Sequence, residues 1–368
     1  MAFQVSPGVQ VKEVDLTNVV PAVSSTSGAF AGSFQWGPVD EVKTVSDAKG
    51  LVDEFSEPAN TNAGAEDFYS AEAFLRYGSS LRVVRVNSTG LFSANSGGSS
   101  SSLLKNHDEY VQSYESGALV GTVGQWTSRC AGSLGNSLKV SLADANTYAT
   151  WTYASQFSTT PNTSTYVANQ GGANDEIHII VVDEDGKFTG TQGTVLEKYG
   201  YVSKASDAKD DSGNTNFYKN VLANKSKYVH WLSHPTGNTA ASYANASSTW
   251  GSAASNISFT KLAANVTLSL ASGADGTIST ANVVTSYDLF DPAESVDINL
   301  VISGPADATI ATSLISMAET RKDCLIFLSP SKANCVDNAN DEVTDIKTYR
   351  DTLTSTSYAV LDSNWKYQ

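Results

Sequence analysis

The sequence predicts an α/β plus β fold, in which both ends of the chain form one discontinuous α/β sandwich domain around a β-rich surface insertion. Three observations predict it: helix and strand patterns alternate in both flanks, period-two patterns dominate the middle, and charge density differs between these parts. The first 90 residues carry 6 basic and 11 acidic side chains, the next 190 carry 11 and 14, and the last 88 carry 6 and 13. We therefore expect the following domains: an N-terminal extended arm at 1–22, an α/β domain at 23–90 and 284–368, and the insertion at 91–283.

The N-terminal flank opens with an alternating segment. Val9, Val11 and, more loosely, Val14 alternate with polar residues after Pro7, which is typical of a half-buried strand that begins near an edge. Helix and strand patterns follow in turn, and Ser46 is a plausible N-cap for the first helix. The expected elements are a strand at 28–34, helices at 47–55 and 67–77, and a strand at 81–86.

The middle of the chain reads mainly as strands. The Ser- and Gly-rich stretch 93–102 has the composition of a flexible linker. The Asp185-Gly186 pair indicates a hairpin turn after an apolar run. The segment 235–282 is dominated by small polar residues, so we expect it to run over the surface. The expected elements are strands at 137–142, 177–182 and 228–232, and a helix at 216–222.

The C-terminal flank returns to the α/β pattern. Two successive strand–helix steps predict a parallel sheet, which needs the elements of residues 1–90 to cover it. The expected elements are helices at 285–290, 308–321 and 345–353, and strands at 297–304, 324–328 and 358–361.

Composition excludes several functions. The formal charge of −15 and pI near 4.6 disfavour non-specific binding to nucleic acid or to anionic lipid. No apolar run approaches the roughly 20 residues that span a bilayer. The first 23 residues contain Glu13 and Asp15 and lack the pattern of a signal peptide. We therefore expect no nucleic-acid partner and no direct membrane insertion.

The cysteines indicate a reducing compartment. Cys130, Cys324 and Cys335 are odd in number and widely spaced, which is typical of free thiols rather than a disulfide framework. Cys324 opens an apolar run that we interpret as a buried strand.

No residue pattern favours catalysis or metal binding. His230 and His234 have the spacing of a helical zinc pair, but the sequence around them predicts a strand, along which four residues span roughly 13 Å. Asp183, Glu184 and Asp185 lack the further ligands of a calcium loop, so a charged hairpin tip is the better interpretation. Phosphate-loop and nucleophile-elbow motifs are absent from the sequence. We expect no enzyme, no cofactor and no bound metal.

Blocks in both flanks resemble the contractile tail sheath proteins of tailed bacteriophages, in particular the T-even type. They occur in the family's order over about half of the chain, and the middle matches loosely through 132–138 and the hairpin after Ile177. The blocks are Ser6-Pro7-Gly8-Val9-Gln10-Val11-Lys12-Glu13, Ala31-Gly32-Ser33-Phe34-Gln35-Trp36-Gly37-Pro38, Phe74-Leu75-Arg76-Tyr77-Gly78, Leu81-Arg82-Val83-Val84-Arg85, Glu294-Ser295-Val296-Asp297-Ile298, Arg321-Lys322-Asp323-Cys324-Leu325 and Trp365-Lys366-Tyr367-Gln368.

Two departures from the family are visible. Larger T-even-type sheath proteins carry a longer insertion near residues 90–120, so we expect this chain to lack an outermost surface domain. The family also continues past the Trp365–Gln368 block into a C-terminal domain that lines the inside of the sheath, and this sequence stops there. We expect the C-terminal domain to be missing from the sequence in hand.

The resemblance implies a structural subunit that polymerises as a helical stack around the tail tube and contracts to drive the tube through the host envelope. Its implied partners are copies of itself, the tail tube protein, and baseplate and tail terminator proteins. The implied location is the virion, with assembly in the host cytoplasm. Val9, Val11 and Val14 are our candidates for a strand shared between subunits. A tailocin or other bacterial contractile injection system stays open as an alternative, and a surface adhesin or receptor-binding β protein is a weaker one.

Overall fold

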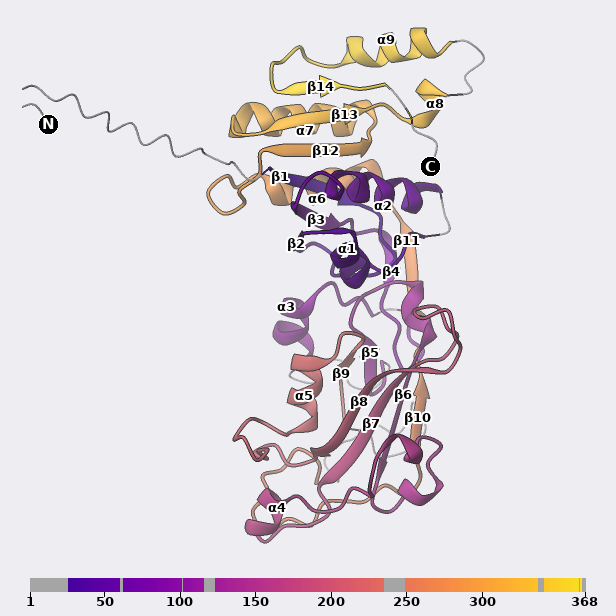
Figure 1. Ribbon diagram of the computed structural model, residues 1–368, viewed down its shortest axis with the longest axis vertical. Helices are drawn as coiled ribbons and strands as arrows, with labels where there is room; N and C mark the ends of the chain where they lie inside the picture. The colour runs from indigo at the N-terminus through magenta and orange to yellow at the C-terminus, as the bar shows by residue number, and fades with distance from the viewer. Residues whose placement is uncertain are drawn as a thin grey trace, which may run out of the picture.

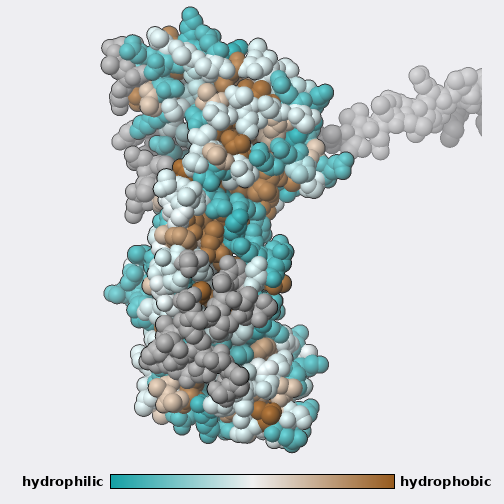
Figure 2. All heavy atoms as spheres, turned by 180° about the vertical axis from the view of Figure 1, so that it is seen from behind, coloured by the Kyte–Doolittle hydropathy of each residue, from teal (hydrophilic) through white to brown (hydrophobic). Residues whose placement is uncertain are grey.

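The computed structural model describes residues 26–59, 62–100, 102–115, 123–234, 249–336, 341–363 and 365. It is a mixed α/β structure with several sheets, drawn out along one axis (Figure 1). We call the part around the larger sheet the α/β body and the part around the smaller sheet the β-rich body. A narrow neck joins them, and the view from behind shows apolar atoms gathered at this waist (Figure 2).

The α/β body is built on a six-stranded sheet in the order β14-β13-β12-β1-β3-β2. All neighbours pair in parallel except β2, which is antiparallel to β3, so the predicted parallel sheet is confirmed. Strands from the two ends of the chain meet where β1 pairs with β12. The strands are β1 (Ser27–Gly32), β2 (Val42–Val45), β3 (Ser80–Arg85), β12 (Leu300–Pro305), β13 (Leu325–Ser329) and β14 (Ala359–Leu361).

Helices cover the two faces of this sheet with separate cores. On one face α1 and α2 bury Leu51, Phe55 and Phe68 against Phe30 of β1. On the other face α6 packs mainly against β1 and β3, and α7 and α9 cover the strands β12 to β14. The helices are α1 (Ala48–Phe55), α2 (Asn62–Leu75), α6 (Thr280–Tyr287) with a 3-10 turn at Asp288–Phe290, α7 (Ala308–Arg321), α8 (Lys332–Cys335) and α9 (Glu342–Thr352).

The β-rich body is built on a four-stranded antiparallel sheet in the order β10-β6-β7-β8. Its core lies between this sheet and the pair β5–β9 with helix α5. The elements are β5 (Trp126–Ser128), β6 (Leu138–Asp144), α4 (Thr165–Asn169), β7 (Glu176–Asp183), β8 (Thr194–Ser203), α5 (Tyr218–Lys225), β9 (Val229–Trp231) and β10 (Val266–Ser269). Short turns complete it: α3 (His107–Glu109), a π-helical turn (Tyr110–Tyr114), and 3-10 turns at Ser133–Ser137, Tyr148–Thr150 and Ala154–Gln156.

Two predictions about the middle of the chain were wrong. The stretch 93–102 is no flexible linker where it is described: Ser93 and Asn95 are fully buried and their backbone N–H groups bond to Ser102 O and Ala271 O. The described residues of 235–282 contain β10, whose alternate side chains Val266 and Leu268 reach the core, and β11 (Ala274–Thr277), which pairs with β4 (Thr89–Phe92) and is mostly exposed.

The predicted Asp-Gly hairpin has a longer loop than a tight turn. β7 and β8 do pair antiparallel, but residues 184–193 connect them. Asp183 organises this loop: its carboxylate accepts bonds from Ser137 Oγ at 2.6 Å and from the N–H of Thr189 at 2.9 Å. These local bonds outweigh the preference of Asp185-Gly186 for a two-residue turn.

Two local predictions in the α/β body also need correction. The N-cap of α1 is Asp47, whose carboxylate accepts a bond from Gly50 N at 2.7 Å, and not Ser46. The strand after Cys324 is buried on one face only, because Phe327 is 39% exposed while Ile326 and Leu328 are buried. Cys130 and Cys324 are buried free thiols, as predicted, and Cys335 is half-buried and free.

The predicted domain boundaries are not tested by these observations, and they stay a prediction. The candidate residues Val9, Val11 and Val14 lie outside the described residues. Within the described ranges, no helix has the length and apolar character needed to cross a membrane.

Candidate functional site

The neck is the place where side chains from both bodies meet. Arg85 ends β3 and is 3% exposed; its Nη1 donates to Gly37 O at 2.9 Å and to Ala131 O at 2.7 Å. Gly37 belongs to the α/β body and Ala131 to the β-rich body, so one guanidinium joins them. Burial lowers the pKa of Arg85, and the charge of Asp275 on β11 partly offsets this effect.

Trp36 is a second contact that joins the two bodies. Its chain segment follows β1, yet its ring is buried in the core of the β-rich body. The ring packs edge-on against Phe188 at 5.0 Å between centroids, and it also contacts Tyr228. A backbone bond from Val39 N to Lys105 O at 2.8 Å adds a third contact. The neck is therefore held by buried groups rather than by chain connectivity alone.

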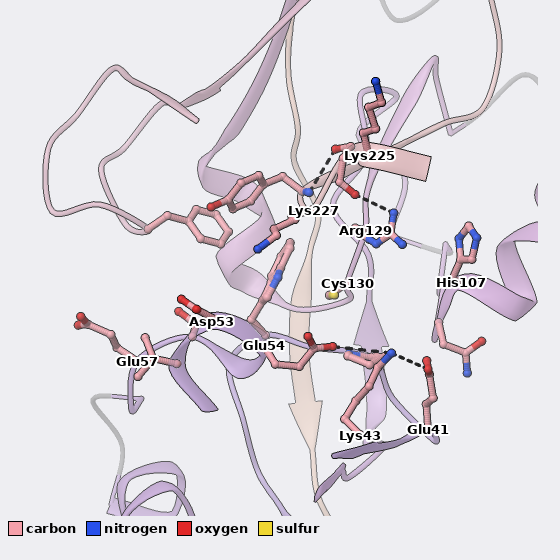
Figure 3. A pocket seen from close by; sticks show the side chains of 18 of the residues that line it. Glu41, Lys43, Asp53, Glu54, Glu57, His107, Arg129, Cys130, Lys225 and Lys227 are labelled. Carbon is pink, nitrogen blue, oxygen red and sulfur yellow. Dashed lines mark hydrogen bonds and ion pairs between the residues drawn. The ribbon is translucent and has the colours of Figure 1, made fainter. Parts of the chain in front are cut away.

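Beside these anchors lies a cleft of about 550 Å³ between the two bodies (Figure 3). The α/β body contributes the turn after β1, the start of β2 and the end of α1; the β-rich body contributes α3, the segment after β5 and the end of α5. Cys130 lines the cleft, but burial raises the pKa of its thiol to about 11. A thiol with such a pKa is a poor nucleophile at neutral pH.

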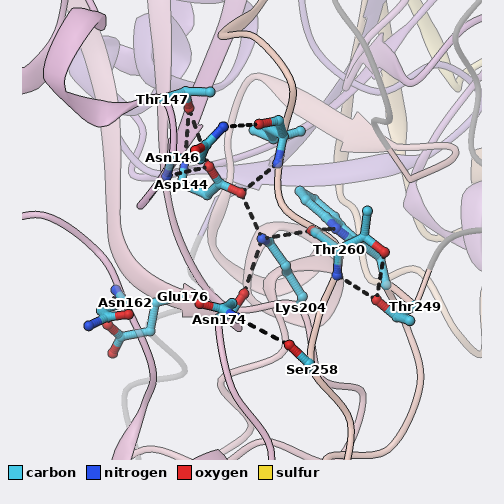
Figure 4. A network of polar contacts seen from close by, with 12 residues as sticks. Asp144, Asn146, Thr147, Asn162, Asn174, Glu176, Lys204, Thr249, Ser258 and Thr260 are labelled. Carbon is cyan, nitrogen blue, oxygen red and sulfur yellow. Dashed lines mark hydrogen bonds and ion pairs between the residues drawn. The ribbon is translucent and has the colours of Figure 1, made fainter.

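A buried polar network lies in the β-rich body (Figure 4). The Nζ of Lys204 donates to Asp144 Oδ2 at 3.0 Å and to the carbonyls of Asn174 and Thr260, each at 3.1 Å. The ammonium also lies 4.7 Å from the ring centre of Trp250. Burial lowers the pKa of Lys204, and the adjacent Asp144 opposes that shift. All three ammonium protons have oxygen partners, so the network ties strand β6 to three loops rather than presenting a reactive amine.

The two histidines that share zinc-like spacing do not converge. His230 on β9 is buried and stacks on Tyr110 at 4.0 Å, while His234 Nδ1 shares a 2.6 Å hydrogen bond with the hydroxyl of Tyr218. Burial is the main reason that the pKa of His230 lies well below its usual value. The described residues contain no group of three His, Cys, Asp or Glu side chains that could hold a metal ion.

Apolar side chains are exposed on the α/β body. Tyr77 at the end of α2 is 96% exposed and Val343 on α9 is 80% exposed. Phe327 on β13 and Val360 on β14 are 39% and 43% exposed, beyond the part of the sheet that α2 covers. Phe327 and Val360 are cross-strand neighbours and form a small apolar patch, whereas single exposed apolar residues such as Tyr77 and Val343 are common on protein surfaces. The polar groups described at the neck and around Lys204 join the two bodies and tie loops to strand β6.

Sequence reasoning missed the neck and the Lys204 network. A signal for Arg85 was present, because strand alternation places it on the same face as Leu81 and Val83, which are fully buried. The partners of Lys204 come from positions 144, 174 and 260, and no local pattern connects them.

Comparisons with known proteins indicate the class of the protein. No family model matches the chain. The tail sheath protein of Salmonella phage ViI is 24% identical and covers 100% of this chain and 66% of its own length. That of Enterobacteria phage T4 is 24% identical, over 99% of this chain and 69% of its own length. That of Vibrio phage KVP40 is 33% identical over 96 residues.

The chain is therefore homologous, over its whole length, to proteins named tail sheath protein from T4-like phages, and the resemblance seen in the sequence is confirmed. It spans about two-thirds of the length of these relatives. The alignment with the ViI protein has 468 positions against 368 residues here, so the relative carries segments within the aligned region that this chain lacks. Among solved structures, sheath tail proteins of Listeria innocua (11% identical; TM-score 0.44; 84% of this chain and 49% of that one) and Desulfitobacterium hafniense (11%; 0.41; 89% and 52%) are similar.

Proposed function

We propose that this protein is a structural subunit of a phage contractile tail sheath, without enzymatic activity. The observation that carries this proposal is the similarity of the whole of this chain to two phage tail sheath proteins. Subunits polymerise as a helical stack around the tail tube and contract to drive the tube through the host envelope. The subunit is a virion component, and its assembly takes place in the host cytoplasm.

The partners that we propose are other copies of the chain, the tail tube protein, and baseplate and tail terminator proteins. The adjacent exposed side chains of Phe327 on β13 and Val360 on β14 support contact with further copies. An interface between different patches of identical subunits propagates as a helix when the rotation between neighbours does not close a ring, and this is the arrangement that we propose. The formal charge of −15 disfavours nucleic acid as a partner.

We also propose the domain division 1–22, 23–90 with 284–368, and 91–283. Pairing of β1 with β12 supports a domain formed by both chain ends. Residues 1–22 are then an arm that adds a strand to the sheet of a neighbouring subunit, and its alternating valines form the apolar face of that strand. Main-chain hydrogen bonds supply the affinity in this mode of binding, and alternate side chains supply the specificity.

Assembly of the full-length gene product tests the function. Negative-stain microscopy is expected to show helical tubes, and uniform small particles at high concentration would contradict the proposal. The arm is tested separately by Val9→Asp with Val11→Asp, which should prevent tubes. The matched control is Gln10→Asp with Lys12→Asp, on the opposite face of the same strand, which should leave tubes intact. Tubes formed equally by both variants would refute the shared strand but not the sheath.

A further inference from the structure

Strand β8 contains a bulge opposite His178. Between two regular pairs of the β7–β8 ladder, His178 alone lies opposite both Gly200 and Tyr201. Tyr201 has a left-handed backbone, with φ of 56°, which residues other than glycine seldom adopt. A bulge of this kind takes a backbone group out of the regular ladder, and the N–H of Tyr201 bonds to a side chain instead.

The imidazole of His178 supplies that partner. Its Nδ1 accepts the N–H of Tyr201 at 3.1 Å, and its Nε2 lies 3.0 Å from the carbonyl oxygen of Thr159. A backbone N–H can only donate and a carbonyl can only accept, so the two bonds together require the neutral tautomer that is protonated at Nε2. The ring therefore connects β8 to the segment 157–162 only while Nδ1 carries no proton.

The ring is fully buried among aromatic side chains. It stacks on Phe157 at 4.1 Å between ring centres and meets the ring of Tyr201 edge-on at 4.6 Å. Gly200 leaves room for this stack, because a Cβ at position 200 would lie 3.3 Å from ring carbons of Phe157. The hydroxyl of Tyr201 is 2.6 Å from Thr159 Oγ1. We call Phe157, Thr159, His178 and Tyr201 the His178 cluster.

The surroundings of the imidazole hold few charges. Residues 145–174, which include the segment that covers the ring, contain no Asp, Glu, Lys or Arg, and β6 places Ala143 opposite His178. Glu176, on the same face of β7, already accepts a bond from Asn162 N at 2.9 Å (Figure 4). The titratable or charged groups that face His178 from β7, β8 and the covering segment are Glu176, Lys198, Tyr201 and Tyr148.

A proton on Nδ1 would meet another donor rather than an acceptor. Nδ1 faces the N–H of Tyr201, and burial lowers the pKa of His178, while the hydrogen bond to the Thr159 carbonyl opposes that shift. A lowered folded-state pKa gives stability that is present above the ordinary histidine pKa of about 6.5 and is lost as the pH falls below it. Acid therefore acts against the closed arrangement of the His178 cluster.

We infer that His178 is a pH-sensitive latch: a proton at Nδ1 breaks the bond to Tyr201, and the segment 157–162 and the bulge of β8 then separate from β7. In the separated form the imidazole is solvated and binds a proton in the ordinary way. The population of that form should therefore rise by at most about 30-fold between about pH 8 and about pH 5. The latch goes beyond the proposed sheath role and does not depend on it, because it works within one chain.

Hydrogen exchange followed by mass spectrometry on the 368-residue chain tests the latch. Peptides that cover 157–162 and 199–203 are followed at about pH 8 and about pH 5, and each rate is divided by the intrinsic exchange rate at that pH. We expect the protection of both peptides to fall by roughly 5- to 30-fold at the lower pH. Peptides from strand β6 report on the body as a whole and should keep their protection.

A variant that cannot titrate separates His178 from other groups. His178→Gln keeps both bonds, since its amide oxygen can accept from Tyr201 N and its amide nitrogen can donate to Thr159 O, so both peptides should stay protected at about pH 5. His234→Gln replaces another histidine of the same body, which bonds to the Tyr218 hydroxyl outside the His178 cluster, and should behave like the parent.

Three results would overturn the latch. The first is equal protection of both peptides in the parent at the two pH values. The second is a loss of protection in His178→Gln as large as in the parent, because Glu176 or another group would then be responsible. The third needs no variant that must fold: nitrogen-15 resonances of the histidine side chains in the parent at about pH 8 should show His178 protonated at Nε2, and protonation at Nδ1 would contradict the bond from Tyr201 N.

Discussion

The carboxyl group of Asp67 should make the stability of the α/β body depend on pH. Asp67 lies in α2, and its Oδ2 accepts a bond from Ser33 N, just after β1, at 2.7 Å. Burial raises the pKa of this carboxyl from 3.8 to about 7, although the Ser33 N–H opposes the shift. The folded protein therefore holds a proton at Asp67 in a pH range where the unfolded chain has released it.

The sign and size of the effect follow from linkage. A raised folded-state pKa gives stability that is fully present below about pH 4 and lost as the pH rises through about 7. A shift of this size corresponds to at most about 4 kcal/mol. Because the side chain keeps partial contact with solvent, we expect about 2 kcal/mol. Asp67→Asn keeps an oxygen acceptor for Ser33 N and removes the charge, so it should stabilise the protein above pH 7 and change little near pH 4.

Urea unfolding at several pH values between about 4 and 8.5 measures this. As the pH rises, the urea concentration at the unfolding midpoint should become increasingly higher for Asp67→Asn than for the parent. Asp351→Asn, an exposed aspartate in helix α9 of the same body, serves as the control and should follow the parent throughout. Parallel curves for Asp67→Asn and the parent would show that Asp67 carries no buried charge at high pH, and the reasoning would fail.

Two further predictions concern buried cations. Lys204→Met should destabilise the protein by roughly 3–5 kcal/mol in urea unfolding, because it leaves the carboxylate of Asp144 buried without its cation. Adding Asp144→Asn should recover part of this loss, and strictly additive effects would contradict the pairing. Arg85→Met should cost about 2–3 kcal/mol by removing charged donors from Gly37 O and Ala131 O. It should also increase hydrogen exchange at the neck, and unchanged exchange there would argue against Arg85 as a link between the bodies.

Several elements were predictable because their information is local. The helix at Ala308–Arg321 begins after Asp307, whose carboxylate accepts from Thr309 N and Ile310 N, and its apolar residues recur on one face. The sequence of strand β6 begins with alternating apolar and polar residues, the period-two pattern of a strand, although the structure buries nearly all of them. Such elements need only neighbouring residues to be recognised, and the structure confirms them.

The Ser-rich stretch after residue 92 shows the opposite case. Its composition is that of a linker, yet Ser93 Oγ accepts a bond from Leu104 N, and the side chain of Asn95 bonds to Ser93 O and Ser99 O. Small polar residues can be buried wherever the surrounding backbone satisfies them. The composition of a segment indicates that burying its polar groups costs free energy. It does not show which hydrogen-bond partners in the folded protein offset that cost.

By itself the sequence determined the alternation of helices and strands in the flanks, the parallel sheet, and the kinship with tail sheath proteins, since these depend on periodicity and on short blocks kept in order. Only the tertiary structure decided the neck: which buried cation meets which carbonyl, how Trp36 enters the core of the other body, and which residues of the two bodies line the cleft between them. These contacts join residues far apart in the chain, and their energies come from burial and geometry that exist only once both bodies have folded.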